Sequence, residues 1–205
     1  MAGEHAGRAR SGYHRGNTRA DAIAAGHALL ASEGIAGITT VAVASQLDVS
    51  RAAVARVFPS ITDLHRVLAE DCVVMLGKAL AEADDRHRVD APEVRWMAIG
   101  QAYLDWSREH PHEYALVFRA GAPGEPRPLM EETGVPVPDA FGMGLPPRSG
   151  DPATHPAFTR WALLHGLATL LNEGPLQDLD TQTADRLVAA TLAQLVAMLR
   201  QSYGE

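Results

Sequence analysis

The sequence predicts an all-helical protein with two domains. Its 205 residues allow one domain of about fifty residues and a second of about 140 with its own core. Residues 38–58 have the pattern of two short helices joined by a tight turn, and longer segments with apolar residues at helical spacing follow. No apolar run approaches the roughly 18 to 20 residues that span a bilayer, and no apolar signal-peptide core is present, so we expect a cytoplasmic protein without membrane contact.

The first predicted helix covers residues 19–33. Its apolar residues fall on one stripe, and Gly34 is a suitable C-terminal stop. The segment before it, residues 1–17, is rich in glycine and arginine, includes Arg15, and has no apolar periodicity. We interpret this segment as a disordered basic arm. Such an arm can lie along phosphates or enter a minor groove, and a solvated tail is the alternative.

The two short helices have the outline of a helix-turn-helix. Thr39 is a suitable N-cap for the first, and Asp48 stands at the turn, where we expect a positive φ. Ser50 caps the second helix, in which Val54 and Phe58 face inward. The outward face has small residues and two arginines, which suits a major groove, and it consists of Arg51, Ala52, Ala55 and Arg56. The outline alone is also found in many small helical domains.

A long helix is predicted from Ile61 to about residue 83. Ser60 and Asp63 form a capping box at its start, directly after Pro59 ends the preceding helix. Cys72, the single cysteine, excludes an intramolecular disulfide and fits a reducing compartment. Its place on the apolar side of the helix favours a buried packing residue, with a thiol sensor as the alternative.

The second domain is predicted to span residues 66–205. After the long helix, its next predicted helix covers residues 93–109. Aromatic residues gather in and after this helix, which indicates either a core or the wall of a cavity. His165, on a later helix over residues 156–173, has two interpretations, a structural hydrogen bond or a ligand contact. The candidate ligand-pocket residues are Met75, Trp96, Tyr103, Trp106, Tyr114, Phe118, Trp161 and His165.

Between these helices, residues 120–156 are rich in proline and glycine and are predicted to form a long loop. A last helix is predicted from about residue 181 to 203. Its small residues permit close helix approach, so two helices from each subunit can build a four-helix dimer interface. The candidate interface residues are Leu164, Ala168, Leu187, Thr191, Leu195 and Met198.

Residues 18–65 resemble the DNA-binding domain of the tetracycline-repressor-like (TetR) family of bacterial transcription regulators. The resemblance is carried by the residues 31–34 (Ala-Ser-Glu-Gly), Thr39 with residues 43–44 (Val-Ala), residues 49–50 (Val-Ser) and residues 58–60 (Phe-Pro-Ser) followed by Leu64. A second segment, residues 161–166, is similar to the Trp-x-x-x-His-Gly signature in the C-terminal domain of one TetR branch. The resemblance implies a homodimer that binds operator DNA and encloses a pocket for a small-molecule effector.

The chain departs from the family pattern at three positions and also in the turn between the two short helices. Family members usually place tyrosine, histidine and lysine, which commonly touch phosphates, where this chain has Ala55, Val57 and Ile61. Asp48 replaces the usual glycine of the turn. These departures motivate an alternative, a small-molecule-binding protein on a TetR-like scaffold with weak or lost DNA binding.

Charge is unevenly distributed along the chain. Six arginines and four acidic residues give residues 1–60 a charge of +2, which leaves −9 on the rest of a chain whose net charge is −7. This distribution argues against a general nucleic-acid coat protein and suits a local DNA-binding surface on an acidic body.

We therefore predict a DNA-binding transcriptional regulator, a ligand-released repressor, in which Arg15, Arg19, Thr39, Thr40, Ser50, Arg51, Ala52, Ala55 and Arg56 contact double-stranded operator DNA. No HExxH motif, cysteine pair or activated nucleophile is present in the sequence, so we predict no catalysis, metal or cofactor. The pair His110 and His112 is interpreted as a helix boundary. An enzyme that uses His165 is the more remote alternative.

Overall fold

The computed structural model describes residues 18–118 and 156–202, and in these ranges the chain is entirely helical. The predicted basic arm with Arg15, and the predicted loop up to residue 155, lie outside the described residues. The described elements are α1 (Thr18–Glu33), a short 3₁₀ helix η1 (Ile35–Gly37), α2 (Thr40–Gln46), α3 (Arg51–Val57), α4 (Ile61–Arg86), α5 (Pro92–Glu109), α6 (Pro111–Phe118), α7 (Pro156–Asn172) and α8 (Thr181–Ser202). The predicted all-α fold is confirmed.

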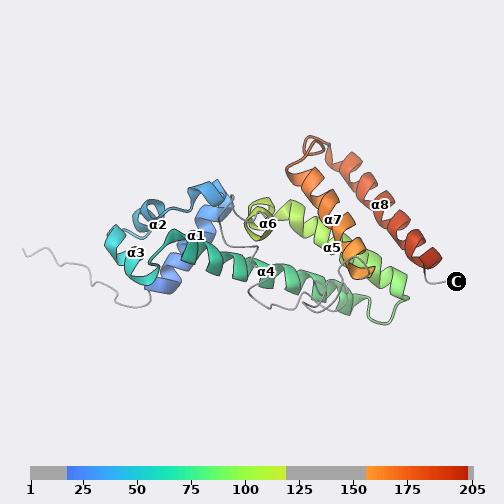
Figure 1. Ribbon diagram of the computed structural model, residues 1–205, viewed down its shortest axis with the longest axis horizontal. Coiled ribbons are helices and arrows are strands. Elements are labelled where there is room, and N and C mark those ends of the chain that lie inside the picture. Colours follow the sequence, from blue (N-terminus) through green and yellow to red (C-terminus); the bar gives the residue numbers. More distant parts are fainter. Residues whose placement is uncertain (1–17, 119–155, 203–205) are drawn as a thin grey trace, which may run out of the picture.

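Helix α4 connects the two halves of the molecule. It has 26 residues and is therefore about 39 Å long. Figure 1 shows α1, α2 and α3 gathered around one end of α4, with α5, α7 and α8 at the other. The buried residues of α4 divide in the same way: Leu64, Leu68 and Cys72 pack among α1–α3, and Leu76 and Leu80 pack against the C-terminal helices.

The first of these two cores, which we call the head core, is formed by α1, α2, α3, the first half of α4 and Val117 of α6. Helices α1 and α4 approach closely at Gly26, where a β-carbon would lie 2.9 Å from Leu68 Cδ1. His27 Nε2 and Asp71 Oδ2 lie 3.0 Å apart across the same two helices. The packing that belongs to the head therefore continues along α4 beyond residue 65, the predicted domain boundary.

Gly34 ends α1 as the sequence predicts. Its φ of 70° and ψ of −170° lie in a region that is essentially restricted to glycine. Its amide donates to the Leu30 carbonyl at 2.9 Å, which satisfies one of the carbonyls left open at the helix end. The chain can therefore turn sharply into η1 and α2.

The second core, which we call the body core, is centred on α5. This helix packs against α4, α7 and α8. Two ion pairs reinforce the packing: Arg95 donates to Asp84 Oδ1 through Nε at 2.9 Å and through a terminal guanidinium nitrogen at 2.5 Å, and Arg108 donates to Asp185 at 2.7 Å. They tie α5 to α4 on one side and to α8 on the other.

None of the helices within the described ranges is both long and apolar enough to cross a membrane.

Candidate functional site

Helices α2 and α3 form a helix-turn-helix whose two helix starts are both capped as predicted. The Thr39 hydroxyl accepts a hydrogen bond from the amide of Ala42 at 3.0 Å, and Ser50 accepts from Ala53 at 3.2 Å. These bonds satisfy amides that have no partner inside the first turn of each helix, so the two short helices begin at fixed residues.

The capping box at the start of α4 is also present. The Ser60 hydroxyl accepts from the amide of Asp63 at 3.1 Å, and the Asp63 carboxylate accepts from the Ser60 amide at 3.0 Å. These bonds hold the pKa of Asp63 below its usual value, so the carboxylate remains charged at neutral pH. The chain can therefore leave α3 at Phe58 and start α4 within three residues.

The turn between α2 and α3 passes through Asp48 in a left-handed conformation. Its φ is 52°, and among the described residues it is the only one other than glycine with a positive φ. Aspartate tolerates this region better than most residues, which confirms the expectation from sequence. The Asp48 side chain is exposed next to the start of α3.

Helix α3 presents the outward face that the sequence predicts. Val54 and Phe58 are buried, while Arg51, Ala52, Ala55 and Arg56 are exposed. Thr39 and Ser50 are also exposed, and Thr40 is half-buried. The face therefore combines two arginines, two methyl side chains and several hydroxyls, which are chemical groups that fit base edges and phosphates.

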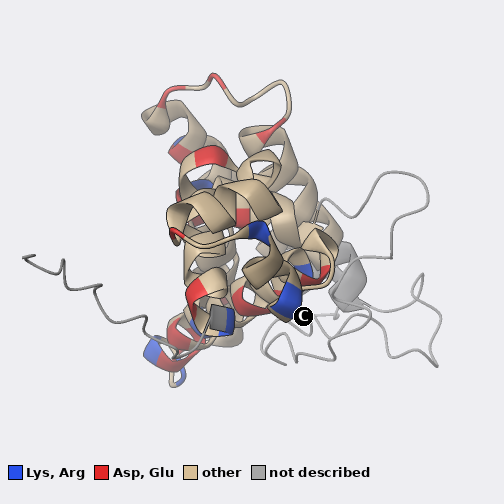
Figure 2. Cartoon of the chain, turned by 90° about the vertical axis from the view of Figure 1, so that its left-hand side faces the viewer, with Lys and Arg blue, Asp and Glu red and all other residues tan. Residues whose placement is uncertain are grey.

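Arg19, at the start of α1, lies beside the end of α3. Its guanidinium carbon is 5.0 Å from the centre of the Phe58 ring, a cation–π distance. This contact is not visible in the sequence, because the two residues are 39 positions apart. Figure 2 looks onto the end of the molecule that carries α2 and α3, and both basic and acidic segments appear on it.

The three positions that depart from the TetR pattern offer no polar side chain to a phosphate. Ala55 is exposed, and Val57 and Ile61 are half-buried and pack against the head core. Arginines and hydroxyls at neighbouring positions are among the polar groups of this surface, together with the Asp48 carboxylate.

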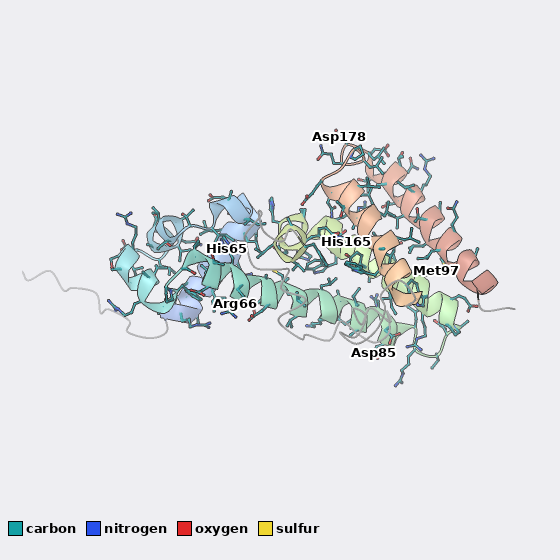
Figure 3. The ribbon with its side chains drawn as sticks, in the orientation of Figure 1. His65, Arg66, Asp85, Met97, His165 and Asp178 are labelled. Atoms are coloured by element: carbon teal, nitrogen blue, oxygen red, sulfur yellow. The ribbon has the colours of Figure 1, made fainter. Side chains whose placement is uncertain are left out.

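A second candidate site lies among α5, α6 and α7, where five rings form what we call the aromatic cluster: Tyr103, Tyr114, Phe118, Trp161 and His165. The Trp161 and His165 rings are stacked, with centroids 5.0 Å apart and planes 17° apart, and Phe118 lies 4.8 Å from His165. Tyr114 lies 4.7 Å from Phe118. Figure 3 shows His165 on α7 where it faces α5 and α6.

Two tyrosine hydroxyls converge on one nitrogen of His165. Tyr114 Oη lies 2.8 Å from His165 Nδ1, and Tyr103 Oη lies 3.1 Å from the same atom. Tyr114 Oη is also 3.3 Å from the His165 carbonyl and 3.4 Å from Thr169 Oγ1. His165 therefore makes a structural hydrogen bond, which is one of the two roles that the sequence suggested for it.

The polar groups of the aromatic cluster are uncharged at neutral pH. Burial lowers the pKa of His165 from its usual value of 6.5 and raises the pKa of Tyr114 above 10.0. Burial is also the main reason why the pKa of Tyr103 lies well above its usual value. The distances from the two hydroxyls to Nδ1 fit a neutral imidazole with its single proton on either ring nitrogen.

The other three predicted pocket residues are Met75, Trp106 and Trp96. Met75 is 40% exposed and does not belong to the body core, and its place in a ligand pocket stays a prediction. Trp106 is buried, and its ring lies 5.3 Å from His110. Trp96 packs against the body core as a half-buried residue. Sequence reasoning missed Thr169, although its position four residues after His165 on the same helix face indicates it.

Helix α6 touches both candidate sites. His110 separates α5 from α6, which confirms that this histidine pair marks a helix boundary. Tyr114 and Phe118 belong to the aromatic cluster, while Val117 packs in the head core. His112 lies against the end of α1, since a β-carbon on Gly34 would be 3.0 Å from its Nδ1. This eight-residue helix therefore connects the cluster to the head.

Three of the predicted dimer-interface residues are buried within the chain itself. Leu164, Ala168 and Leu195 pack in the body core, so they have no surface to offer a second chain. Leu187 and Thr191 are half-buried, and the Met198 side chain lies outside what the structure describes. Exposed residues of α7 and α8 near these positions include Leu163, Gly166 and Leu170 on α7, and Ala189, Ala190 and Ala193 on α8.

Cys72 is buried, as the sequence predicts. Burial raises the pKa of its thiol to about 12, so the thiolate required of a sensor is not available at neutral pH. Within the described parts of the chain, no group of three or more His, Cys, Asp or Glu residues could hold a metal ion.

Residues 96–195, from α5 to α8, match the family model described as the Tetracyclin repressor-like, C-terminal domain. No curated protein matches the chain. Among solved structures, it is similar to a protein with unknown function from Rhodococcus sp. RHA1, with a TM-score of 0.66 and 24% identity over 92% of this chain and 98% of that one. It is also similar to the "putative regulatory protein SCO4313", with a TM-score of 0.63 and 22% identity over 87% of this chain and 95% of that one. The fold is therefore shared along nearly the whole chain.

Proposed function

We propose that the chain is a TetR-family transcriptional regulator, a cytoplasmic homodimer that binds double-stranded operator DNA and is released from it by a small-molecule effector. The observation that carries the proposal is the outward face of α3, in which Arg51 and Arg56 flank small side chains on a helix whose start is capped by Ser50. The match of residues 96–195 to a Tetracyclin repressor-like C-terminal domain supports it independently. A regulator of this kind needs no catalytic residue.

The exposed faces of α7 and α8 support the dimerisation part of the proposal. Leu163 and Leu170 are each 41% exposed and lie two helical turns apart on α7, with Gly166 between them on the same face. The alanines exposed on α8 permit close helix approach. Two α7–α8 pairs packed as a four-helix bundle would place two α3 helices on one side of the dimer, where each could read one half-site.

Effector binding at the aromatic cluster could reach the head through α6. Tyr114 and Phe118 would respond directly to a ligand, and His112 and Val117 of the same helix contact the head. An effector that prefers one position of α6 would bias the placement of the two heads and thereby the affinity for DNA.

A selection of duplexes from a random library would test the proposal with purified full-length chain. An enriched inverted repeat, bound by two chains per duplex, is the expected result, because a two-fold dimer reads two equivalent half-sites. Selection that enriches no sequence over the starting library would contradict sequence-specific binding.

The second candidate function is a small-molecule-binding protein with weak or lost DNA binding. It is favoured by Ala55, Val57 and Ile61, which leave three positions of the DNA-facing end without a polar side chain. Ligand binding without binding to any duplex, even at low salt, would support this function.

A further inference from the structure

The outward face of α3 has two methyl groups in its middle and one arginine on each side. A helix turns about 100° per residue, so Arg51, Ala55, Ala52 and Arg56 lie at about 0°, 40°, 100° and 140° around the axis of α3. All four residues are exposed, and we call them the α3 face. The inference below rests on the proposed function, since it treats the α3 face as the surface that meets DNA.

The two arginines of the α3 face have no carboxylate partner among the described residues. Several other arginines of the described helices are held by carboxylates, in the pairs Arg66–Glu70, Arg95–Asp84 and Arg108–Asp185. Helix α3 itself has no acidic residue. Two cations that are not neutralised, with an apolar strip between them, fit a ligand that carries negative charge on both sides of exposed bases. A major groove has this form, because phosphates line its walls and base edges form its floor.

The middle of the α3 face has no hydrogen-bonding side chain. The methyl groups of Ala52 and Ala55 neither donate nor accept, so they can contact a base only through an apolar group. Among the four bases, thymine alone presents an apolar group in the major groove, its C5 methyl. Alanine is also short enough to let the backbone of α3 approach the base edges closely. The apolar middle of the face therefore matches thymine better than any other base.

We infer that each half-site of the operator contains a thymine whose C5 methyl packs against Ala52 and Ala55. Helix α3 then recognises this base pair by an apolar contact rather than by a hydrogen bond. Arg51 and Arg56, on the two sides of the contact, hold the helix in the groove. The alanines are thus specificity-determining residues of the proposed DNA-binding surface.

Substitution of deoxyuridine for thymine tests the inference on the duplex selected from the random library. Uracil keeps the hydrogen-bonding groups of thymine and lacks only the methyl. Each thymine of the half-site is replaced in turn, in both half-sites together, and the affinity of the full-length chain is measured at one salt concentration. Loss of one buried methyl should weaken binding about fourfold, so the symmetric change should weaken it about 15-fold at the contacted thymine. Thymines outside the half-sites are the control and should tolerate uracil.

Glycine variants assign the effect to the two alanines. In Ala52→Gly/Ala55→Gly the affinity ratio of the thymine duplex to the uracil duplex should fall from about 15 to about one, because both methyl partners are gone. The matched control is Ala81→Gly, which places glycine at an exposed position in the body half of α4 and should keep the ratio of wild type. If the double variant does not fold, the two single variants replace it, each with an intermediate ratio.

The outcomes separate this inference from the proposed function. Uracil tolerated at every half-site thymine, or a half-site without thymine, would overturn the inference and leave a chain that selects an inverted repeat as a regulator. An equal uracil penalty in wild type and in the α3 variants would also overturn it, since the methyl would then be sensed by another residue or through DNA shape. Selection that enriches no duplex would refute the proposed function and this inference with it.

Discussion

Replacing Asp48 tests both the turn geometry and the electrostatics of the proposed DNA-binding surface. The residue has a φ of 52°, is exposed, and makes no side-chain hydrogen bond to any described residue. Asp48→Asn removes the charge and keeps a side chain that tolerates positive φ. Asp48→Gly removes the charge and also relieves the conformation. The two variants therefore separate charge from backbone strain.

The magnitudes follow from simple estimates. A carboxylate about 10 Å from a phosphate in water is repelled by about 0.4 kcal/mol, which is a factor of about two in affinity for each head. A dimer bound to two half-sites should then gain about two- to fourfold from Asp48→Asn. The gain should shrink at high salt, because the screening length falls from about 30 Å at 0.01 M to about 8 Å at 0.15 M.

For stability, we expect Asp48→Asn to change the free energy of unfolding by less than about 0.5 kcal/mol, since no described hydrogen bond is lost. Asp48→Gly should raise it by about 0.5–1 kcal/mol, because glycine adopts positive φ without steric cost. In a chain of this length, 1 kcal/mol raises the Tm by about 2–4 °C.

The assays are operator titrations at two salt concentrations and thermal unfolding. Asp178→Asn is the matched charge control, because Asp178 is exposed in the α7–α8 connection, far from α3 (Figure 3). Weaker operator binding by Asp48→Asn would refute the reasoning, as it would mean that the carboxylate contributes a favourable contact. An equal gain from Asp178→Asn would refute it as well, since the effect would then reflect net charge alone.

Three further predictions concern stability. Removing either cap, by Ser50→Ala or Thr39→Ala, should lower the free energy of unfolding by about 1 kcal/mol in urea titrations, whereas Ser45→Ala, on an exposed residue of α2, should change it by less than about 0.5. Gly34→Ala should cost about 1–3 kcal/mol because of the backbone conformation of Gly34, and an unchanged urea midpoint would contradict that assignment. Burial lowers the pKa of His165 from 6.5, so below that pH the unfolded state binds more protons than the folded state and stability falls. His165→Phe should lose less stability than wild type between pH 7.5 and 5, and an equal loss in both chains would show that His165 is not the group responsible.

Local signals explain why the head was predictable from sequence. The caps Thr39 and Ser50, the positive φ of Asp48 and the capping box of Ser60 each depend on residues within three positions of one another. Interactions of such short range can be predicted from the residue types at neighbouring positions. The outward face of α3 then follows from helical periodicity alone.

The C-terminal half was less predictable because its contacts join distant residues. Tyr103 and His165 are 62 positions apart, and nothing in the sequence indicates that one tyrosine hydroxyl reaches that imidazole. Periodicity also does not decide between two apolar faces of one helix. On α8, Val188 and Leu192 face the body core, whereas the predicted stripe followed Leu187 and Thr191.

The central claim is that α3 reads DNA, and salt-dependent binding to the selected duplex tests it most directly. We compare wild type, the double variant Arg51→Ala/Arg56→Ala, and a control that removes two exposed arginines at the other end of α4, Arg86→Ala/Arg88→Ala. The account predicts that the first double variant loses specific binding and that its log–log salt slope becomes shallower by about 0.9 for each lost phosphate contact, while the control behaves as wild type. Equal affinity and equal slope in wild type and the α3 double variant would contradict it.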